Sequence, residues 1–358
     1  MTASTKRADV VHREDFMKQR LLIALLVVPV VATMASVVFR TDGIGSPEAD
    51  TTSQQVLTLN GAVQFGEDHA FTQTARKFEE LVKEYYGKPI NFELYVNSEL
   101  GLEKDYFAYM SHGIAVDYAI VTPAHMSTFS ESAPLVDMPF LFRDVDHWNK
   151  VLDSDALDPI VSEIRERADV MLIGYAGGGV RNLIVNRPIT NMAELKGLSM
   201  RVMGAPIQTR IFQAIGASPS VIAYSEVYNA IQTGVIDAAE NEASGIQQMK
   251  FYEVGPEISQ TQHAITVRPL CFSGKTFRRL PPDLQAAIVK AGREAGEFGR
   301  HLESTEDAAM LSGMEKDGKL KAHEFTQREE LLRLAEPVKQ EYAREIKAEE
   351  ILARINAL

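Results

Sequence analysis

The chain has 358 residues, of which 45% are apolar and 24% are charged. This composition excludes a disordered or collagen-like protein, and the length is more than one compact core usually absorbs, so two domains are expected. The formal charge is −12 and no stretch after residue 40 concentrates Lys and Arg, so no nucleic acid is expected as a partner.

The first forty residues differ from the rest of the chain. They carry six basic and three acidic side chains, which leaves a charge of −15 on the other 318 residues. The apolar run at 21–39 follows Lys18 and Arg20, an order typical of an export signal, and small residues before Ser36 offer a cleavage site. The run is also nearly long enough to span a bilayer, so an uncleaved anchor is the alternative. In both cases the chain from about Gln54 onward is expected to be exported.

Apolar spacing in the next part of the chain predicts alternating strands and helices. The strands are expected at 56–59, 90–96, 116–121, 170–174 and 183–185. The helices are expected at 71–85 and 103–112. Gly87 and Gly113 are expected to end these helices, and three consecutive glycines at 177–179 are expected to end the strand before them. The βαβαβ order predicts a mainly parallel sheet with helices on both faces.

A second series of elements follows. Helices are expected at 207–215 and at 225–234, the latter with Ser225 as its N-cap, and a short strand at 235–237. Apolar residues at helical spacing from Asp283 predict a helix of about thirty residues, which is long enough to brace two domains. The charged tail, 327–358, predicts one or two solvated helices. Two α/β units in series are therefore the expected architecture.

Most motifs for catalysis and cofactors are absent. Gly274-Lys275-Thr276 lacks the earlier glycine of a phosphate-binding loop, because Pro269 stands there, and the glycines at 177–179 lack the dinucleotide-binding order. No His-Glu-x-x-His or paired-cysteine spacing indicates zinc, and no Gly-x-Ser-x-Gly turn is present. No cofactor and no metal are therefore expected. A Ser/His/Asp triad assembled across the fold stays open, so an exported hydrolase is the rival class.

The most informative residues lie between Gly179 and Ile265. This region contains the segments RNLIVNRPI (181–189), GLSMRV (197–202) and EVYNAIQTG (226–234). On these residues the chain resembles the solute-binding subunit of tripartite ATP-independent periplasmic (TRAP) transporters. The resemblance runs from about Val56 to Gln285 and so covers most of the exported chain.

The resemblance implies an α/β, two-lobe, periplasmic-binding-protein-like fold with mainly parallel sheets, a hinge and a long helix that crosses both lobes. The expected parts are an export leader or anchor with a linker at 1–54, a first lobe at 55–178 plus about 264–300, and a second lobe at 179–263 plus about 301–358. The segment at about 264–300 is expected to give the first lobe a return strand and the crossing helix, and the segment at about 301–358 to give the second lobe its C-terminal helices. The implied protein is a periplasmic receptor, not an enzyme. It binds a small carboxylate, such as a sugar acid or a dicarboxylate, between the lobes and delivers it to TRAP membrane subunits. A membrane-tethered sensory binding protein is a further alternative if the leader stays attached.

The resemblance also implies a ligand site. The carboxylate-binding arginine of the family falls on Arg201, and a planar guanidinium suits both oxygens of a carboxylate. The other implied site residues are Arg181, Asn241, Tyr224, Thr122, Glu240, His263 and Glu103. Taken by residue type alone, each also has an ordinary structural role. Tyr224 suits a core aromatic, Asn241 a turn cap and His263 a buried histidine with satisfied hydrogen bonds.

Overall fold

The structure is a computed structural model that describes residues 56–358, so the leader predicted at 1–54 lies outside the described residues. Residues 55–358 form one compact unit by their contacts. Within 56–358, no helix combines the length and the apolar character of a membrane span.

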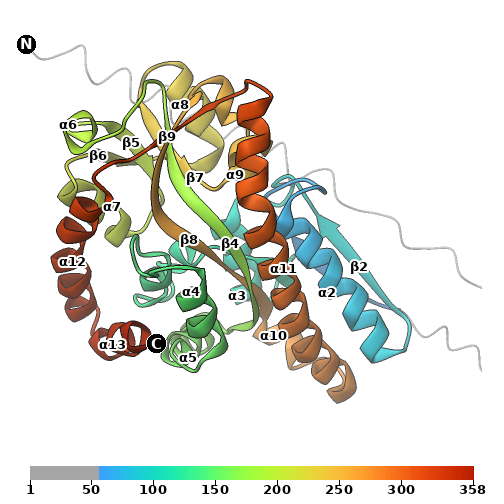
Figure 1. Cartoon of the computed structure of the whole chain (residues 1–358). Helices are drawn as coiled ribbons and strands as arrows, with labels where there is room; N and C mark the ends of the chain where they lie inside the picture. The colour runs from blue at the N-terminus through green and yellow to red at the C-terminus, as the bar shows by residue number, and fades with distance from the viewer. Residues whose placement is uncertain (1–55) are drawn as a thin grey trace, which may run out of the picture. The chain divides into compact units, whose positions relative to one another are not determined.

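The described residues contain nine strands in a single mixed sheet (Figure 1). The strands are β1 (Leu57–Ala62), β2 (Ile90–Tyr95), β3 (Tyr118–Ile120), β4 (Val170–Val185), β5 (Ser199–Val202), β6 (Ser218–Val221), β7 (Ala238–Asn241), β8 (Glu257–Ser273) and β9 (Lys321–Glu324). Their order is β2-β1-β3-β8-β4-β7-β5-β6, and β9 pairs with β8. Pairs β1–β2, β1–β3, β5–β6, β5–β7 and β8–β9 are parallel, whereas β8 and β4 are antiparallel to each other and to their outer neighbours β3 and β7. The predicted α/β fold with mainly parallel pairing is confirmed. The antiparallel pairing at the centre of the sheet was not predicted from the sequence.

Twelve α-helices of the described part pack around this sheet. They are α2 (Ala70–Tyr86), α3 (Glu103–His112), α4 (Val145–Asp153), α5 (Asp158–Ala168), α6 (Met192–Leu195), α7 (Pro206–Ala214), α8 (Val227–Gln232), α9 (Ala243–Gln248), α10 (Gly274–Phe277), α11 (Pro282–Lys316), α12 (Arg328–Glu345) and α13 (Glu349–Ala357). We call β1–β3 with α2 and α3 the first lobe, and β5–β7 with α7–α9 the second lobe. Strands β4 and β8 pass through both. The residue boundaries predicted for the two lobes stay a prediction.

The helices of the first lobe follow their sequence signals closely. Gly87 ends α2 and Gly113 ends α3, each in the left-handed conformation with φ of 63° and 68°, which costs glycine little because it has no Cβ. In both cases the backbone N–H of the glycine donates to a carbonyl of the last turn. These two predicted helices and the glycines that end them are therefore confirmed.

Strand β4 corrects the sequence analysis. The glycines at 177–179 do not end a strand, because β4 continues through them and joins the two short strands predicted at 170–174 and 183–185. Gly177 and Gly178 adopt φ of 112° and 121°, and the register against β8 shifts between Gly177 and Val180. Partner strands on both sides maintain the pairing around this irregularity. The glycines therefore mark a bulge in a long strand and not its end.

Two short elements of the second lobe also differ from the prediction. The segment expected to be one helix from 225 begins as a single 3₁₀ turn, Tyr224–Glu226, and continues as α8, so Ser225 is not its N-cap. The strand predicted at 235–237 begins later, as β7, and the side chain of Val235 is 68% exposed. Ile236, by contrast, is 1% exposed, so its apolar side chain packs in the core just before the strand begins.

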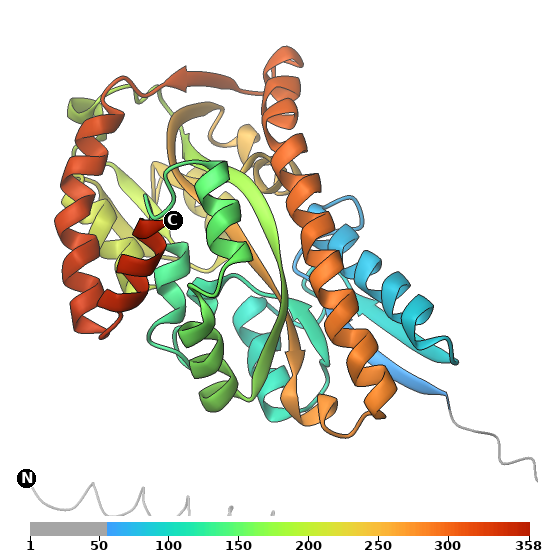
Figure 2. The same ribbon diagram turned by 60° about the horizontal axis from the view of Figure 1, so that its bottom comes forward.

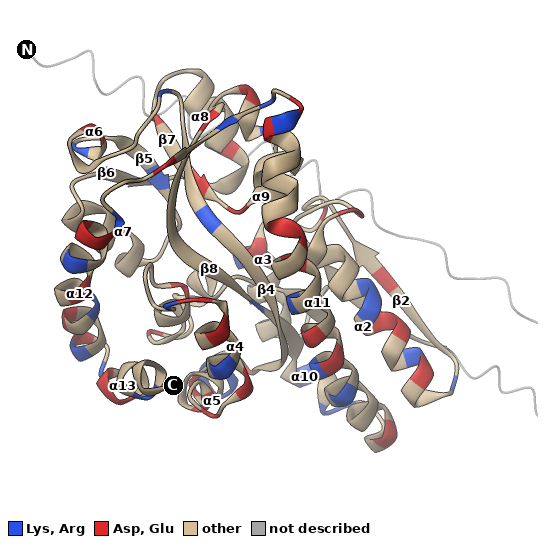
Figure 3. Cartoon of the chain, viewed as in Figure 1, with Lys and Arg blue, Asp and Glu red and all other residues tan. Residues whose placement is uncertain are grey.

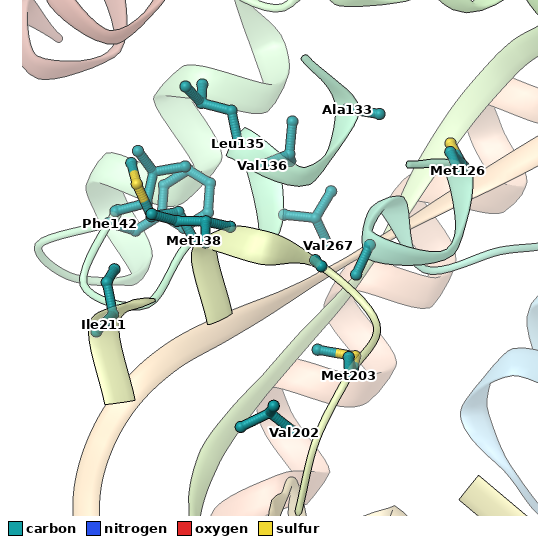
Figure 4. Close-up of a cluster of buried hydrophobic side chains, with 14 of the residues drawn as sticks. Met126, Ala133, Leu135, Val136, Met138, Phe142, Val202, Met203, Ile211 and Val267 are labelled. Atoms are coloured by element: carbon teal, nitrogen blue, oxygen red, sulfur yellow. The ribbon is translucent and has the colours of Figure 1, made fainter. Parts of the chain in front are cut away.

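An apolar cluster joins the first-lobe loops to the second lobe. Met126, Met138 and Phe142 come from the segment after β3, and they pack with Val202 and Ile211 of β5 and α7 (Figure 4). All of these side chains are buried. Residues of both charges are interspersed along α2, α11 and α12 (Figure 3). The cluster therefore fixes the loops after β3 and β5, which carry several site residues.

Helix α11 confirms the predicted long helix and lies against β4 along much of its length (Figure 2). Its approach is close because glycines face each other at the crossing. A Cβ on Gly174 would lie 2.0 Å from the carbonyl oxygen of Gly292, and one on Gly296 would lie 2.6 Å from the backbone nitrogen of Tyr175. Neither contact is possible without moving backbone, so small residues set the spacing of helix and strand.

We therefore expect Gly174→Ala to lower the free energy of unfolding by about 2–3 kcal/mol, the usual scale for overpacking. Urea unfolding measures this change. The control is Gly313→Ala on the same helix, where an added Cβ meets no atom within 4 Å. It is expected to raise stability by about 0.5–1 kcal/mol because alanine favours a helix. Equal effects of the two substitutions would contradict the close crossing.

Candidate functional site

A cavity lies where strands of both lobes end. Gln64, Thr122, Met203 and Glu242 follow the C-terminal ends of β1, β3, β5 and β7, and all four line the cavity. The empty space among these residues, counted together with the open space at its mouth, is about 300 Å³. Crevices at the carboxyl ends of parallel strands are the usual ligand sites of open α/β sheets. The topology thus creates one site from loops that are far apart in the sequence.

The structure brings most of the predicted site residues to this cavity. Six of the eight line it: Glu103, Thr122, Arg181, Arg201, Tyr224 and Asn241. The other two, Glu240 and His263, are not among the lining residues and lie behind Arg181. The sequence analysis missed seven lining residues: Gln64, Phe65, Phe71, His125, Met203, Glu242 and Arg268.

Arg201 is a buried cation without an anionic partner among the described residues. It lies on β5 and is 3% exposed. Its Nε donates to the carbonyl of Ile222 at 3.0 Å, and its guanidinium carbon lies 5.5 Å from the centre of the Tyr224 ring. Burial lowers the pKa of Arg201, although an arginine stays charged in proteins. The two terminal nitrogens make no hydrogen bond within residues 56–358 and therefore remain available to a ligand.

Arg181 presents the opposite situation, because protein groups accept from every N–H of its guanidinium. Nε donates to Glu240, Nη1 donates to Glu242 and at 2.8 Å to Oδ1 of Asn241, and Nη2 donates to the carboxylate and the carbonyl of Glu240, both at 2.8 Å. Burial alone would lower the pKa of Arg181, but Glu240 and Glu242 raise it above its ordinary value. A direct contact of Arg181 with a ligand stays a prediction. In the structure this residue organises the carboxylates around it.

Glu240 and His263 form a buried layer behind Arg181. His263 Nε2 lies 3.3 Å from Glu240, and its Nδ1 lies 2.8 Å from the hydroxyl of Thr261. Burial would raise the pKa of Glu240, but Arg181 and His263 hold it well below its usual range. Burial lowers the pKa of His263, which keeps the imidazole neutral at pH 7. These two residues therefore position Arg181 and do not reach the cavity.

Tyr224 and Asn241 serve both the core and the site. Asn241 donates from Nδ2 to the Tyr224 hydroxyl at 2.7 Å, and its Oδ1 accepts from Arg181 and from the backbone of Glu242. The Tyr224 ring packs edge-on against Phe65 and Phe251, at 5.8 and 5.7 Å between ring centres. Burial raises the pKa of Tyr224, so its hydroxyl stays protonated and can donate a hydrogen bond to a ligand oxygen.

The first lobe contributes a polar wall. Glu103 begins α3, and one of its carboxylate oxygens accepts from the backbone N–H of Thr122. His125 follows in the 3₁₀ turn after β3 and lines the same wall. Burial lowers the pKa of His125, so its ring is neutral at pH 7. The wall thus offers a carboxylate oxygen and a neutral imidazole to hydroxyl groups.

Arg268 is the most informative residue that the sequence analysis missed. It lies on β8, is 3% exposed, and its guanidinium carbon is 5.1 Å from the centre of the Phe71 ring. Its terminal nitrogens lie 3.5 Å from Glu242 and 3.9 Å from Asp137. Burial raises the pKa of Asp137 to about 6, although Arg268 opposes the shift. Polar residues in an otherwise buried strand were the available signal for β8, but only a return strand after about residue 264 was predicted, without bounds, and Arg268 was not singled out.

Two acids of α11 hold the bulge of β4 beside the site. Glu303 accepts from the backbone N–H of Gly179 at 3.2 Å and from the hydroxyl of Thr266 at 2.9 Å. Asp307 accepts from the N–H groups of Val180 and Ala243. Burial, and then the charge of Glu242, raise the pKa of Glu303 to about 7. The second oxygen of Glu303 has no hydrogen-bond partner in the described part of the chain.

The raised pKa of Glu303 gives a pH-dependent stability. Because its folded-state pKa of about 7 lies above the ordinary value of 4.5, the folded protein binds this proton more tightly than the unfolded chain. The carboxyl therefore lowers the free energy of unfolding as pH rises from about 4.5 to about 7, and this loss persists at higher pH.

We expect Glu303→Gln to melt several degrees above wild type at pH 8 and close to wild type at pH 5. The amide keeps one acceptor oxygen and carries no charge towards Glu242. Thermal unfolding at the two pH values measures the effect. Glu306→Gln, an exposed position on the same helix, is the control and should change neither value. A difference between Glu303→Gln and wild type that is the same at both pH values would contradict the buried titration.

Comparison with known proteins gives one family. The family model for bacterial extracellular solute-binding proteins of family 7 matches residues 61–347. A solute-binding protein of Sulfitobacter sp. (strain NAS-14.1) is 54% identical over 306 residues, which cover 86% of this chain and 93% of that protein.

Solved structures of TRAP periplasmic solute-binding proteins are similar to this chain over most of its length, and two of them illustrate the match. A TRAP periplasmic solute-binding protein from Sulfitobacter sp. NAS-14.1 with bound α-D-taluronate has a TM-score of 0.82 and 54% identity, and the match covers 84% of this chain and 97% of that one. A TRAP periplasmic solute-binding protein from Roseobacter denitrificans OCh 114 with bound L-galactonate has a TM-score of 0.75 and 29% identity, covering 85% and 98% of the two chains.

Proposed function

The chain belongs to the bacterial extracellular solute-binding proteins of family 7, and from this premise we propose that it is a periplasmic receptor for six-carbon sugar acids. The resemblance to TRAP solute-binding subunits is confirmed by the family match and by the solved structures. The proposed ligands are hexuronates and the related aldonates, because two of the similar structures hold taluronate and galactonate. The ligand is proposed to occupy the cavity between the lobes.

One observation supports this proposal above the others: Arg201 is buried, lines the cavity and has no anionic partner within residues 56–358. An unpaired buried charge costs several kcal/mol, and the cost falls when an anion supplies the missing partner. A carboxylate that accepts two parallel N–H bonds from the terminal nitrogens fits this requirement. Arg181 lines the same cavity, but its guanidinium already donates to protein groups, so it does not need a ligand anion as Arg201 does.

The remaining groups suit the rest of a sugar acid. The Tyr224 hydroxyl can donate a hydrogen bond to a ring or hydroxyl oxygen of the ligand. Glu103 and His125 can accept hydrogen bonds from its hydroxyl groups. Residues of both lobes would then contact one ligand and stabilise the closed arrangement, with β4 and β8 as the connections that bend. The closed receptor would deliver the acid, chemically unchanged, to TRAP membrane subunits. The lobe boundaries at about 178, 264 and 300, and the cleavage of the leader, belong to this proposal.

Calorimetric titration of the purified protein with D-galacturonate, D-glucuronate and D-galactonate tests the proposal. At least one of these acids is expected to bind at a single site with a dissociation constant in the micromolar range or below, and mass spectrometry should recover it unchanged. Absence of binding to all three, at concentrations up to the millimolar range, would contradict the receptor. Conversion of a bound acid into a new product would favour an exported hydrolase or another enzyme.

A further inference from the structure

We propose that the cavity accepts sugar acids with one carboxylate and rejects the corresponding aldarates, which carry a second carboxylate at the far end, and that Glu103 is a residue that enforces this selection. The inference rests on the proposed function and specifies the charge of the ligand. Its basis is the pairing of charged side chains around the cavity.

The three buried arginines of the cavity are unequal in their partners. Arg181 lies between Glu240 and Glu242, and Arg268 lies between Glu242 and Asp137. Arg201 alone of the three has no carboxylate partner in the described part of the chain. One negative charge on a ligand would therefore complete the pairing.

A second negative charge would find no cation to pair with. Arg268 is the one candidate, since its Nε has no hydrogen-bond partner among residues 56–358. However, its terminal nitrogens already face two carboxylates, and Phe71 lies beside its guanidinium at 5.1 Å. Arg268 can therefore donate to a neutral oxygen, but its charge is already balanced. A second negative charge on a ligand would therefore remain unpaired among buried side chains.

Glu103 adds a negative charge to the cavity wall, and this charge repels a second carboxylate of a ligand. It is 3% exposed, and one of its oxygens accepts from the backbone N–H of Thr122. The other oxygen makes no hydrogen bond within the described residues, so it can accept a hydrogen bond from a ligand hydroxyl. A carboxylate in the place of that hydroxyl would bring two anions together, which costs several kcal/mol at a buried site.

Galactonate and galactarate provide a matched pair of ligands. They have the same hydroxyl configuration and differ at the far end, where galactarate has a carboxylate in place of a CH₂OH group. We expect wild-type protein to bind galactarate at least ~100-fold more weakly than the better of D-galactonate and D-galacturonate. Calorimetry, with displacement titration for the weak ligand, measures this ratio at pH 7.5.

Glu103→Gln separates charge from shape. The amide keeps an acceptor for the Thr122 N–H and adds a donor towards the ligand, so the ratio should fall to about tenfold or less. Glu99→Gln removes the same charge from an exposed position near α3 and should leave the ratio at its wild-type value.

The outcomes of this experiment are distinct. If D-galactonate, D-galacturonate and D-glucuronate all fail to bind, the proposed function itself is contradicted. If a monocarboxylate binds tightly and galactarate binds equally well, the receptor stands and the inference of selection is overturned. If wild type rejects galactarate but Glu103→Gln rejects it to the same degree, the assignment to Glu103 is overturned.

Discussion

Arg201→Met is expected to weaken sugar-acid binding by at least ~100-fold while the protein stays as stable as wild type to within about 1 kcal/mol. The loss of affinity follows because no other cation at the cavity lacks a carboxylate partner in the described residues. The unchanged stability follows because Arg201 holds no carboxylate that its removal would leave unpaired. Its single hydrogen bond, to Ile222, is offset by the removal of a buried charge.

Calorimetry and urea unfolding of the same preparations measure both quantities. Arg201→Lys is the informative control: it keeps the charge but lacks the planar pair of donors, so we expect intermediate affinity. An Arg201→Met protein with wild-type affinity would refute the role of Arg201. A protein that unfolds would show that the guanidinium serves the fold.

Arg181→Met is expected to lower the free energy of unfolding by about 3–5 kcal/mol, although both arginines are buried in the same cavity. Its removal leaves Glu240 and Glu242 buried without the guanidinium that accounts for most of their hydrogen bonds. The two variants are therefore expected to differ in stability because Arg181 has carboxylate partners and Arg201 has none, and not because one arginine is more buried than the other.

Two further variants test this explanation. Adding Glu240→Gln and Glu242→Gln to Arg181→Met removes the orphaned charges, and part of the lost stability should return. Arg167→Met removes an exposed arginine whose ion pair with Glu163 spans 3.5 Å, and this change should be worth less than about 0.5 kcal/mol. The explanation fails if Arg181→Met is as stable as Arg201→Met.

Local signals were sufficient where a residue determines its own conformation. Gly87 and Gly113 end helices because the left-handed conformation is open to them, and the apolar spacing that begins at Leu284 predicts the long helix α11, whose buried face also carries Glu303 and Asp307. The glycines at 177–179 do not end the strand, because β8 pairs alongside them and the N–H groups of Gly178 and Gly179 donate to Thr266 and Glu303, which supports a strand that its own sequence does not favour. Such long-range support is invisible in a single sequence.

The candidate site divides in a similar way. Arg201, Tyr224 and Asn241 could be placed because they stand in segments that resemble a known family. His125, Glu242 and Arg268 come from loops and a strand that meet only in the folded chain, and no spacing between them reveals it. The resemblance placed Glu240 and His263 at positions that line or support the pocket, and in the structure both lie behind Arg181.

The most direct test of the pairing between Arg201 and the ligand is a double cycle measured by calorimetry. D-galacturonate and D-galactose, which has CH₂OH in place of the carboxylate, are each titrated into wild type and into Arg201→Met. We predict that removing the carboxylate or the guanidinium alone weakens binding by at least ~100-fold, and that removing both is little worse than removing one. Two losses that simply multiply would show that the carboxylate and Arg201 do not meet.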